Sequence, residues 1–334
     1  MSQLEILIIF FLFNLFLVIN FDKIKFLNSI IDKPDKQRKF HKKPTALAGG
    51  IILILNLLIY FIILKVDKNL IKQEILFSDF SELNLFILTC FLVFILGYLD
   101  DKFNFNPIIK FFFSIIIISF FILLNDENLI KTLNFSFLNK KFILGDYSFL
   151  FTLFCYVVFL NAFNMFDGIN LQASSYSLII LIYFLAITQN SILLFILIIF
   201  ILFFKYLNSR NKSFLGDNGS LLISFIISFI LIKLFNQNLI LFSDEIFVLL
   251  MIPGVDMIRL FFERIKNQRN PLSFDRLHLH HLLIDKFSHT RTLSIINFLI
   301  ILPIICIYLK MNNSLIILSS ICIYLLLLFF IRKN

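Results

Sequence analysis

The chain has 334 residues, of which 60% are hydrophobic and only 15% are charged, and its mean hydropathy is +0.94. About a quarter of the residues of an average soluble domain are charged, so this composition excludes a disordered chain and a soluble globule, which would need a polar surface. Although the net charge is +9, the apolar excess also excludes a soluble nucleic-acid-binding domain and indicates a polytopic membrane protein.

Apolar stretches recur along the chain, and about 17 to 20 such residues are enough to cross a bilayer as a helix. The sequence therefore predicts an all-α membrane protein with about eleven transmembrane helices, in which residues 1–334 form one integral membrane domain. The predicted spans are 4–21, 47–64, 85–99, 108–124, 149–166, 171–188, 191–207, 219–235, 245–262, 293–309 and 314–331.

The first predicted span lacks the basic leader and the cleavage site of a signal peptide, so we expect it to remain as a helix. A dense basic segment, 22–45, follows it. When the spans alternate across the bilayer, most of the 30 lysines and arginines fall on the side of this segment. The positive-inside bias then predicts a periplasmic N-terminus and a cytoplasmic C-terminus, and it accounts for the positive charge without nucleic acid.

Polar and ionisable residues gather at the predicted cytoplasmic ends of the spans, which favours a functional site on that face. Asp100 and Asp101 end one apolar span, and Lys110 begins the next. Adjacent carboxylates repel each other unless a cation lies near them or one takes up a proton. The pair suits Mg²⁺ and the lysine suits a phosphate, although a pair at the membrane exit and a snorkelling lysine fit the same pattern.

Asn161 and Asn164 lie three residues apart, on one face of a predicted helix, and Asp167 extends that face by another turn. The glycine that follows, Gly168, allows the chain to break before the next span. Stacked amide and carboxylate oxygens can line a cation site, whereas hydrogen bonding between helices is the alternative explanation.

Residues 214–220 form a short turn in which Asp217 lies between Gly216 and Gly219 at the start of a span. Glycines permit close approach of the backbone, and a helix N-terminus suits phosphate. Asp217 would then hold a metal that bridges phosphates, and an ordinary helix cap is the alternative.

Three histidines, His278, His280 and His281, follow Arg276 in a predicted cytoplasmic loop. The absence of a His-Glu-x-x-His motif or cysteine partners disfavours zinc. Arginine and histidine beside carboxylates suit a phosphorylated substrate, and a solvated basic loop is the alternative. Together these groups predict metal-assisted phosphoryl transfer between a soluble and a lipid substrate at the cytoplasmic membrane surface.

In chain order, these motifs resemble those of the polyprenyl-phosphate N-acetylhexosamine-1-phosphate transferases. They are most similar to the bacterial UDP-GlcNAc:undecaprenyl-phosphate GlcNAc-1-phosphate transferases of glycosyltransferase family 4. The resemblance begins at Asp32 to His41 and includes Pro44, Gly49 and Gly50. It covers essentially the whole chain and implies the same eleven-span topology.

Carried over residue by residue, the resemblance implies that Asn164 and Asp217 hold Mg²⁺, with Mn²⁺ as an alternative ion. Asp100 and Asp101 would position or deprotonate the lipid phosphate, and Lys110 would contact the substrate pyrophosphate. The residues implied to hold the uracil are Phe214 and Asn170. The further catalytic residues it implies are Asp167, His280 and His281, with Arg276 and His278 on the sugar phosphate.

The implied reaction is attack of undecaprenyl phosphate on the β-phosphorus of a UDP-sugar, UDP-GlcNAc first, with release of UMP. It would initiate a cell-surface polysaccharide at the cytoplasmic face of the bacterial inner membrane. A homodimer is compatible with this topology. The loops expected to form the active site are 22–45, 100–107, 167–170, 208–218 and 263–292.

Three alternatives stay open. Many bacterial members read Asp where this chain has Asn170, so a different UDP-2-acetamido sugar, such as a 6-deoxy form, is one alternative donor. A polytopic transporter should carry ionisable residues along both access routes rather than at one face. A catalytically inactive scaffold would not need to retain the metal and phosphate residues.

Overall fold

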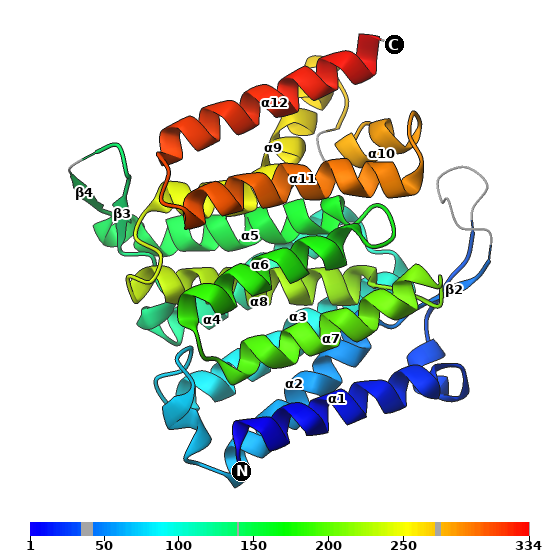
Figure 1. Cartoon of the computed structure of the whole chain (residues 1–334), viewed down its shortest axis with the longest axis vertical. Coiled ribbons are helices and arrows are strands. Elements are labelled where there is room, and N and C mark those ends of the chain that lie inside the picture. The colour runs from blue at the N-terminus through cyan, green and yellow to red at the C-terminus, as the bar shows by residue number, and fades with distance from the viewer. Residues whose placement is uncertain (35–42, 139, 271–274, 334) are drawn as a thin grey trace. The chain divides into compact units, whose positions relative to one another are not determined.

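The computed structural model describes residues 1–34, 43–138, 140–270 and 275–333, and these residues form twelve α-helices and little sheet (Figure 1). The α-helices are α1 (Gln3–Ile19), α2 (Gly49–Val66), α3 (Phe80–Phe103), α4 (Pro107–Leu123), α5 (Ser148–Phe166), α6 (Gln172–Thr188), α7 (Ile192–Ser209), α8 (Gly216–Asn236), α9 (Ser243–Lys266), α10 (Leu279–Ile284), α11 (His289–Tyr308) and α12 (Asn313–Lys333). The short 3₁₀ helices are Phe21–Lys23, Lys25–Asn28, Leu70–Gln73, Asp126–Asn128 and Gly145–Tyr147. The strands are β1 (Ile31–Asp32), β2 (Thr45–Leu47), β3 (Thr132–Asn134), β4 (Lys141–Ile143) and β5 (Ser213–Phe214).

Every segment predicted to span the membrane forms a helix, and α10 is an additional short helix inside the loop 263–292. In the described part of the chain, seven helices are long and apolar enough to cross a membrane. Helices α1, α4 and α6 are apolar but shorter, and α9 carries ionisable side chains along its length. The chain is therefore an all-α, multi-pass membrane protein, and the count of eleven spans and their orientation stay predictions.

The described residues divide into two compact units. The first unit comprises residues 1–125 and 181–227, and the second comprises 126–180 and 228–334. Two parts of the predicted loops, residues 35–42, which include His41, and residues 271–274, lie outside the described residues.

In the first unit, α7 packs against α1 and α2, and α3 packs against α2 and α4. Buried amides link α1 to α2, because Asn14 donates to Asn56 at 2.7 Å and receives a hydrogen bond from it at 3.2 Å. Both side chains are almost fully buried. Between apolar helices, such a mutual amide pair supplies directional attraction that packing alone lacks.

Replacing one member of this amide pair should destabilise the first unit more than replacing both. Asn14→Leu removes the donor to the buried side-chain oxygen of Asn56, whose nitrogen still donates to the carbonyl oxygen of Ile52 at 2.8 Å. The loss is expected to cost about 1–2 kcal/mol. The double variant Asn14→Leu/Asn56→Leu removes both polar groups and should recover part of that loss. Thermal unfolding in detergent measures both, and equal losses for the single and double variants would contradict the expectation.

A small sheet brings together chain segments that precede two different helices of the first unit. Strand β2 pairs antiparallel with β1 and parallel with β5, with Ala46 opposite Ser213 and Leu47 opposite Phe214. Since β2 leads into α2 and β5 leads into α8, the pairing places the starts of these helices side by side. A Cβ on Gly50 of α2 would lie only 2.5 Å from the carbonyl oxygen of Asn218 in α8, so this close approach requires glycine.

In the second unit, α9 packs against α5, α11 and α12. The hairpin of β3 and β4 is tied to the beginning of α9, where the backbone N–H of Ser136 donates to Asp244 at 2.9 Å. At the other end of α9, polar side chains meet the segment that leads into α10. The second unit thus places the histidine motif beside the C-terminal half of α9.

Candidate active site

Three helices of the first unit bring Asp100, Lys110 and Asp217 together. Asp100 lies in the last turn of α3, and Lys110 and Asp217 lie in the first turns of α4 and α8. The Nζ atom of Lys110 is 2.7 Å from a carboxylate oxygen of Asp100 and 2.7 Å from one of Asp217. Two carboxylates therefore share one ammonium group.

The short connection between α3 and α4 explains why Lys110 returns to Asp100. Helix α3 ends at Asn104, whose left-handed conformation (φ 50°) reverses the chain. The N–H of Phe105 donates to Asp100 at 2.8 Å, and Asn106 caps α4, whose first residue is a proline. Lys110 then lies about one turn into α4, within 2.7 Å of Asp100.

Asp101 has different partners from its neighbour Asp100. Its carboxylate accepts hydrogen bonds from the backbone N–H groups of Asp217 at 2.9 Å and Asn218 at 3.0 Å, and from the side-chain amide of Asn218. The first N–H groups of a helix have no acceptor within the helix, so Asp101 caps α8. Gly216 permits this approach, because it adopts φ +72° and a Cβ there would lie 2.8 Å from Asp101.

The second unit brings the 161–170 motif against the histidine motif. Gly168 packs so closely on the ring of His280 that any Cβ at this position would overlap it. The side-chain nitrogen of Gln172 lies 3.4 Å from Nδ1 of His280, and Nε2 of His289 lies 3.1 Å from the carbonyl oxygen of Asn170. Two motifs more than a hundred residues apart in sequence are therefore neighbours in this unit.

The predicted residues of the 161–170 motif lie at the end of α5 and in the turn after it. Asn161 and Asn164 lie within α5, Asp167 is its C-terminal cap residue, and Asn170 is in the turn before α6. The side chain of Asn161 donates to the backbone of its own helix, to Val157 at 2.7 Å.

Comparison with known proteins decides what kind of protein carries these two clusters. Residues 83–235 match the family described as glycosyl transferase family 4. The chain is 26% identical over 298 residues to the undecaprenyl-phosphate alpha-N-acetylglucosaminyl 1-phosphate transferase of Salmonella typhi, covering 85% of this chain and 77% of the relative. The chain is thus similar to glycosyl transferase family 4 over less than half of its length, and to this transferase over most of it.

Other relatives of the chain carry similar descriptions. The undecaprenyl-phosphate alpha-N-acetylglucosaminyl 1-phosphate transferase of Yersinia pestis is 28% identical over 290 residues, which is 83% of this chain and 76% of the relative. A probable undecaprenyl-phosphate N-acetylglucosaminyl 1-phosphate transferase of Bacillus subtilis is 26% identical over 276 residues, or 80% and 73%. The predicted resemblance to this family is therefore confirmed, and so is the prediction of a transferase enzyme.

The histidines of the motif lie close together in the second unit. The ring centroids of His280 and His281 are 4.2 Å apart, and those of His278 and His280 are 5.3 Å apart. Burial, followed by repulsion from His281 and His278, holds the pKa of His280 well below its usual range. Burial, followed by repulsion from His278 and Arg276, lowers the pKa of His281 to about 4. Both rings are neutral at pH 7.

Mild acid should therefore destabilise the histidine motif. Because the folded protein lowers the pKa of His281 from 6.5 to about 4, the unfolded chain binds a proton at this histidine more readily than the folded protein does. The stability that the neutral ring contributes is therefore fully present above pH 6.5 and is lost as the pH falls toward 4. For the partly exposed His281 we expect a loss of about 1 kcal/mol at pH 5. Thermal unfolding in detergent at pH 7.5 and pH 5 measures this loss, and His281→Gln should reduce it; an identical pH response in this variant would contradict the expectation.

Three residues of the second unit that the sequence analysis gave no role surround the histidine motif: Asp256, Arg259 and Tyr324. An acidic residue inside an apolar helix, followed by an arginine one turn later, was the sequence feature that could have indicated Asp256 and Arg259.

Of the predicted substrate-binding residues, Arg276 is half-exposed and forms a loose ion pair with Asp285 at 3.6 Å.

The oxygen donors of the first unit fit a hard divalent cation. Across the described ranges, no group of three or more His, Cys, Asp or Glu is arranged as a metal site. However, Asp100 and Asp217 already converge on one cationic group, at 2.7 Å each, and carboxylate oxygens are the ligands that Mg²⁺ prefers. Of the two implied metal ligands, Asp217 belongs to the first unit and Asn164 to the second.

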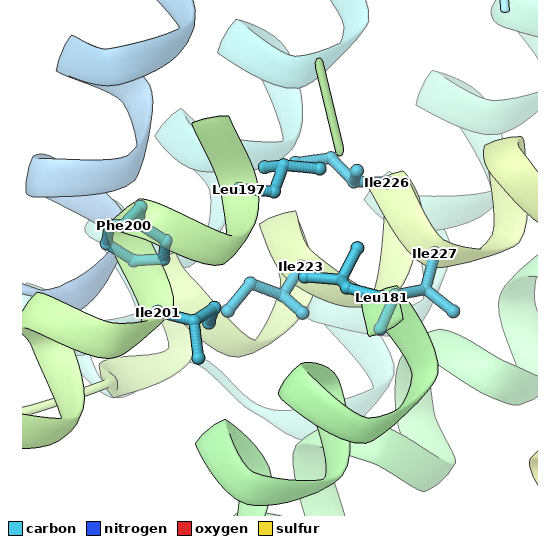
Figure 2. Close-up of a pocket in the computed structure, with 7 residues that line it drawn as sticks. All are labelled: Leu181, Leu197, Phe200, Ile201, Ile223, Ile226 and Ile227. Carbon is cyan, nitrogen blue, oxygen red and sulfur yellow. The ribbon is translucent and has the colours of Figure 1, made fainter. Parts of the chain in front are cut away.

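An apolar hollow in the first unit does not contribute to this chemistry. Figure 2 shows the side chains of α6, α7 and α8 that line it, which carry no polar atoms for a nucleotide or a phosphate. The lining residues are Leu181, Leu197, Phe200, Ile201, Ile223, Ile226 and Ile227.

Proposed function

We propose that this enzyme transfers a sugar 1-phosphate from a UDP-sugar to undecaprenyl phosphate and releases UMP. The observation that supports this most directly is the ammonium group of Lys110 held between the carboxylates of Asp100 and Asp217. The relatives named above act on undecaprenyl phosphate and N-acetylglucosaminyl 1-phosphate by their descriptions, so GlcNAc 1-phosphate is the first choice of transferred group.

The reaction brings two anions together, so its main requirement is positive charge placed where the phosphates meet. Lys110 lies in the first turn of α4 at the end of the membrane helix, where its ammonium group would contact the pyrophosphate. The divalent ion that Asn164 and Asp217 would hold supplies, when bound, further neutralisation of the pyrophosphate and of the departing UMP. Asp100 would orient the lipid phosphate.

Direct attack is the favoured route. A phosphate monoester has its second pKa near 6, so the lipid phosphate is mostly a dianion at pH 7 and is already a nucleophile. Asp101 would contribute by holding the start of α8, since its oxygens accept the N–H groups of Asp217 and Asn218. A covalent aspartyl intermediate is then unnecessary.

The remaining residues would bind the donor. Phe214 and Asn170 would hold the uracil by stacking and hydrogen bonding. The residues proposed for the sugar phosphate and its chemistry are Asp167, Arg276, His278, His280 and His281. Because His280 and His281 are neutral at pH 7, they would act as hydrogen-bonding groups, and Arg276 would supply the positive charge.

The reaction would take place at the cytoplasmic face of the bacterial inner membrane and begin a cell-surface polysaccharide. Membranes containing the enzyme, incubated with undecaprenyl phosphate and radiolabelled UDP-GlcNAc, should yield lipid-extractable label and an equal amount of UMP. Parallel reactions with UDP-GalNAc and a UDP-6-deoxy sugar test the donor, and EDTA with Mg²⁺ or Mn²⁺ restored tests the ion. Label in inverted but not right-side-out vesicles would support the cytoplasmic site. No lipid-linked label from any donor would overturn the proposal.

A further inference from the structure

A buried carboxylate in α9 has no part in the function proposed above. The side chain of Asp256 is only 6% exposed, yet it receives several hydrogen bonds. The donors are His278 through Nδ1 at 2.9 Å, Arg259 at 2.8 Å, the Tyr324 hydroxyl at 2.7 Å and the backbone N–H of Leu279 at 3.2 Å. Such a fully satisfied buried network fixes its members in one arrangement.

Arg259 extends this network to the chain just before α10. It lies three residues after Asp256 on the same helix, and its guanidinium also donates to the carbonyl oxygen of Leu277 at 2.7 Å and to the Tyr324 hydroxyl at 3.0 Å. Asp256 and Arg259 thus hold the residues on both sides of His278. An exposed basic loop would not need this arrangement, because burying charged groups costs free energy unless their partners are well placed.

The hydrogen bond to Asp256 also determines which nitrogen of His278 is available. A carboxylate accepts hydrogen bonds and does not donate them, so Nδ1 of His278 must carry the hydrogen. Nε2 is then the ring nitrogen that remains for other contacts. Carboxylates that orient a functional histidine in this way fix both its tautomer and the direction of its ring.

We propose that Asp256 is a positioning residue for the histidine motif, acting through His278 and, with Arg259, through the entry into α10. The inference rests on the proposed function for the statement that His278 contacts the sugar phosphate. It extends that function by assigning a role to a buried residue that meets the substrate only through the imidazole it orients.

The first test is the variant Asp256→Asn, whose amide cannot replace the carboxylate as acceptor for all these donors. We expect kcat for lipid-linked product to fall about 100-fold, with a much smaller change in KM for the lipid. The matched control is Asp244→Asn, a buried aspartate of the same helix bonded to Ser136, which lies about 18 Å along the axis. This control should leave kcat within about twofold.

Measuring the same substitution in the His278→Ala enzyme distinguishes positioning of His278 from a general loss of stability. If Asp256 acts through His278, Asp256→Asn should cost little further activity once His278→Ala is present, whereas independent effects would multiply. Should Asp256→Asn fail to accumulate, Tyr324→Phe removes one donor to the same carboxylate with little change of shape. It should lower kcat several-fold only when His278 is present. Equal factors in both backgrounds would overturn the inference.

Backbone hydrogen–deuterium exchange gives a readout that needs no substrate. Residues 277–284 should exchange faster in Asp256→Asn than in the wild type, whereas Asp244→Asn should leave them unchanged. If the wild type makes no lipid-linked product but this exchange pattern appears, the proposed function fails and the positioning of His278 stands. Exchange that is unaffected by Asp256→Asn would refute the positioning role itself.

Discussion

Lys110→Met should lower the transfer of sugar phosphate about 1,000-fold. In the first unit, Lys110 holds two carboxylates at 2.7 Å each. The methionine side chain has a similar length but no charge, so Asp100 and Asp217 would face each other without the ammonium group between them. Repulsion would move Asp217 away from its place at the start of α8, and the pyrophosphate would lose a cationic partner.

The matched control for this prediction is Lys233→Met. Lys233 is also a buried lysine at the end of a hydrogen-bonded ion pair, 2.9 Å from Glu127, but it lies near the other end of α8. The variant Lys233→Met should lower thermal stability and leave the rate per folded enzyme within a few-fold of the wild-type rate. Initial rates of lipid-linked label, divided by the amount of folded enzyme in detergent, measure both variants. Similar rates for the two would contradict the role given to Lys110.

The helices could be predicted from the sequence because both lipid and protein interior accept apolar side chains. Long apolar runs must form helices to satisfy their backbone groups in a bilayer, and each predicted run does so here. The segments missed are short and lie outside those runs. Helix α10 and strands β1, β2 and β5 depend on partners from distant parts of the chain, which periodicity does not reveal.

The two carboxylates of the pair show where sequence reasoning about the site stops. The contact of Asp100 with Lys110 follows from the short connection between two predicted helices, which is three residues long in the structure. The role of Asp101 depends instead on α8, more than a hundred residues further along, and on how closely that helix approaches. The partners of Asp256 were missed for the same reason, because Tyr324 and His278 lie 68 and 22 residues away from it.

The protonation of the histidines was also hidden from the sequence. Next to Arg276, a run of three histidines looks cationic, yet burial keeps the pKa of His280 low and repulsion by its neighbours lowers it further. Whether a histidine is buried depends on how the second unit packs, and residues 278–281 alone do not reveal it.

Gly97→Ala should strongly destabilise the first unit. Gly97 lies in α3, one turn before Asp100, and a Cβ there would lie 2.5 Å from Cα of Asn218 and 2.5 Å from the carbonyl oxygen of Asp217. Both are backbone atoms, so no side-chain rotation relieves the overlap. Helix α8 would have to move away from α3. This movement costs about 3 kcal/mol and breaks the hydrogen bonds by which Asp101 caps α8.

Gly254→Ala is the control, because it makes the same change within a helix of equal length. Among the described residues, no neighbouring atom lies within 4 Å of the position that a Cβ on Gly254 would occupy. Alanine forms helix more readily than glycine, so this variant should be neutral or more stable by about 0.5–1 kcal/mol. Thermal unfolding in detergent together with initial rates measures both variants. A Gly97→Ala enzyme with wild-type stability and activity would show that α3 and α8 do not need their backbones in contact, and that Asp217 can reach Lys110 without the cap from Asp101.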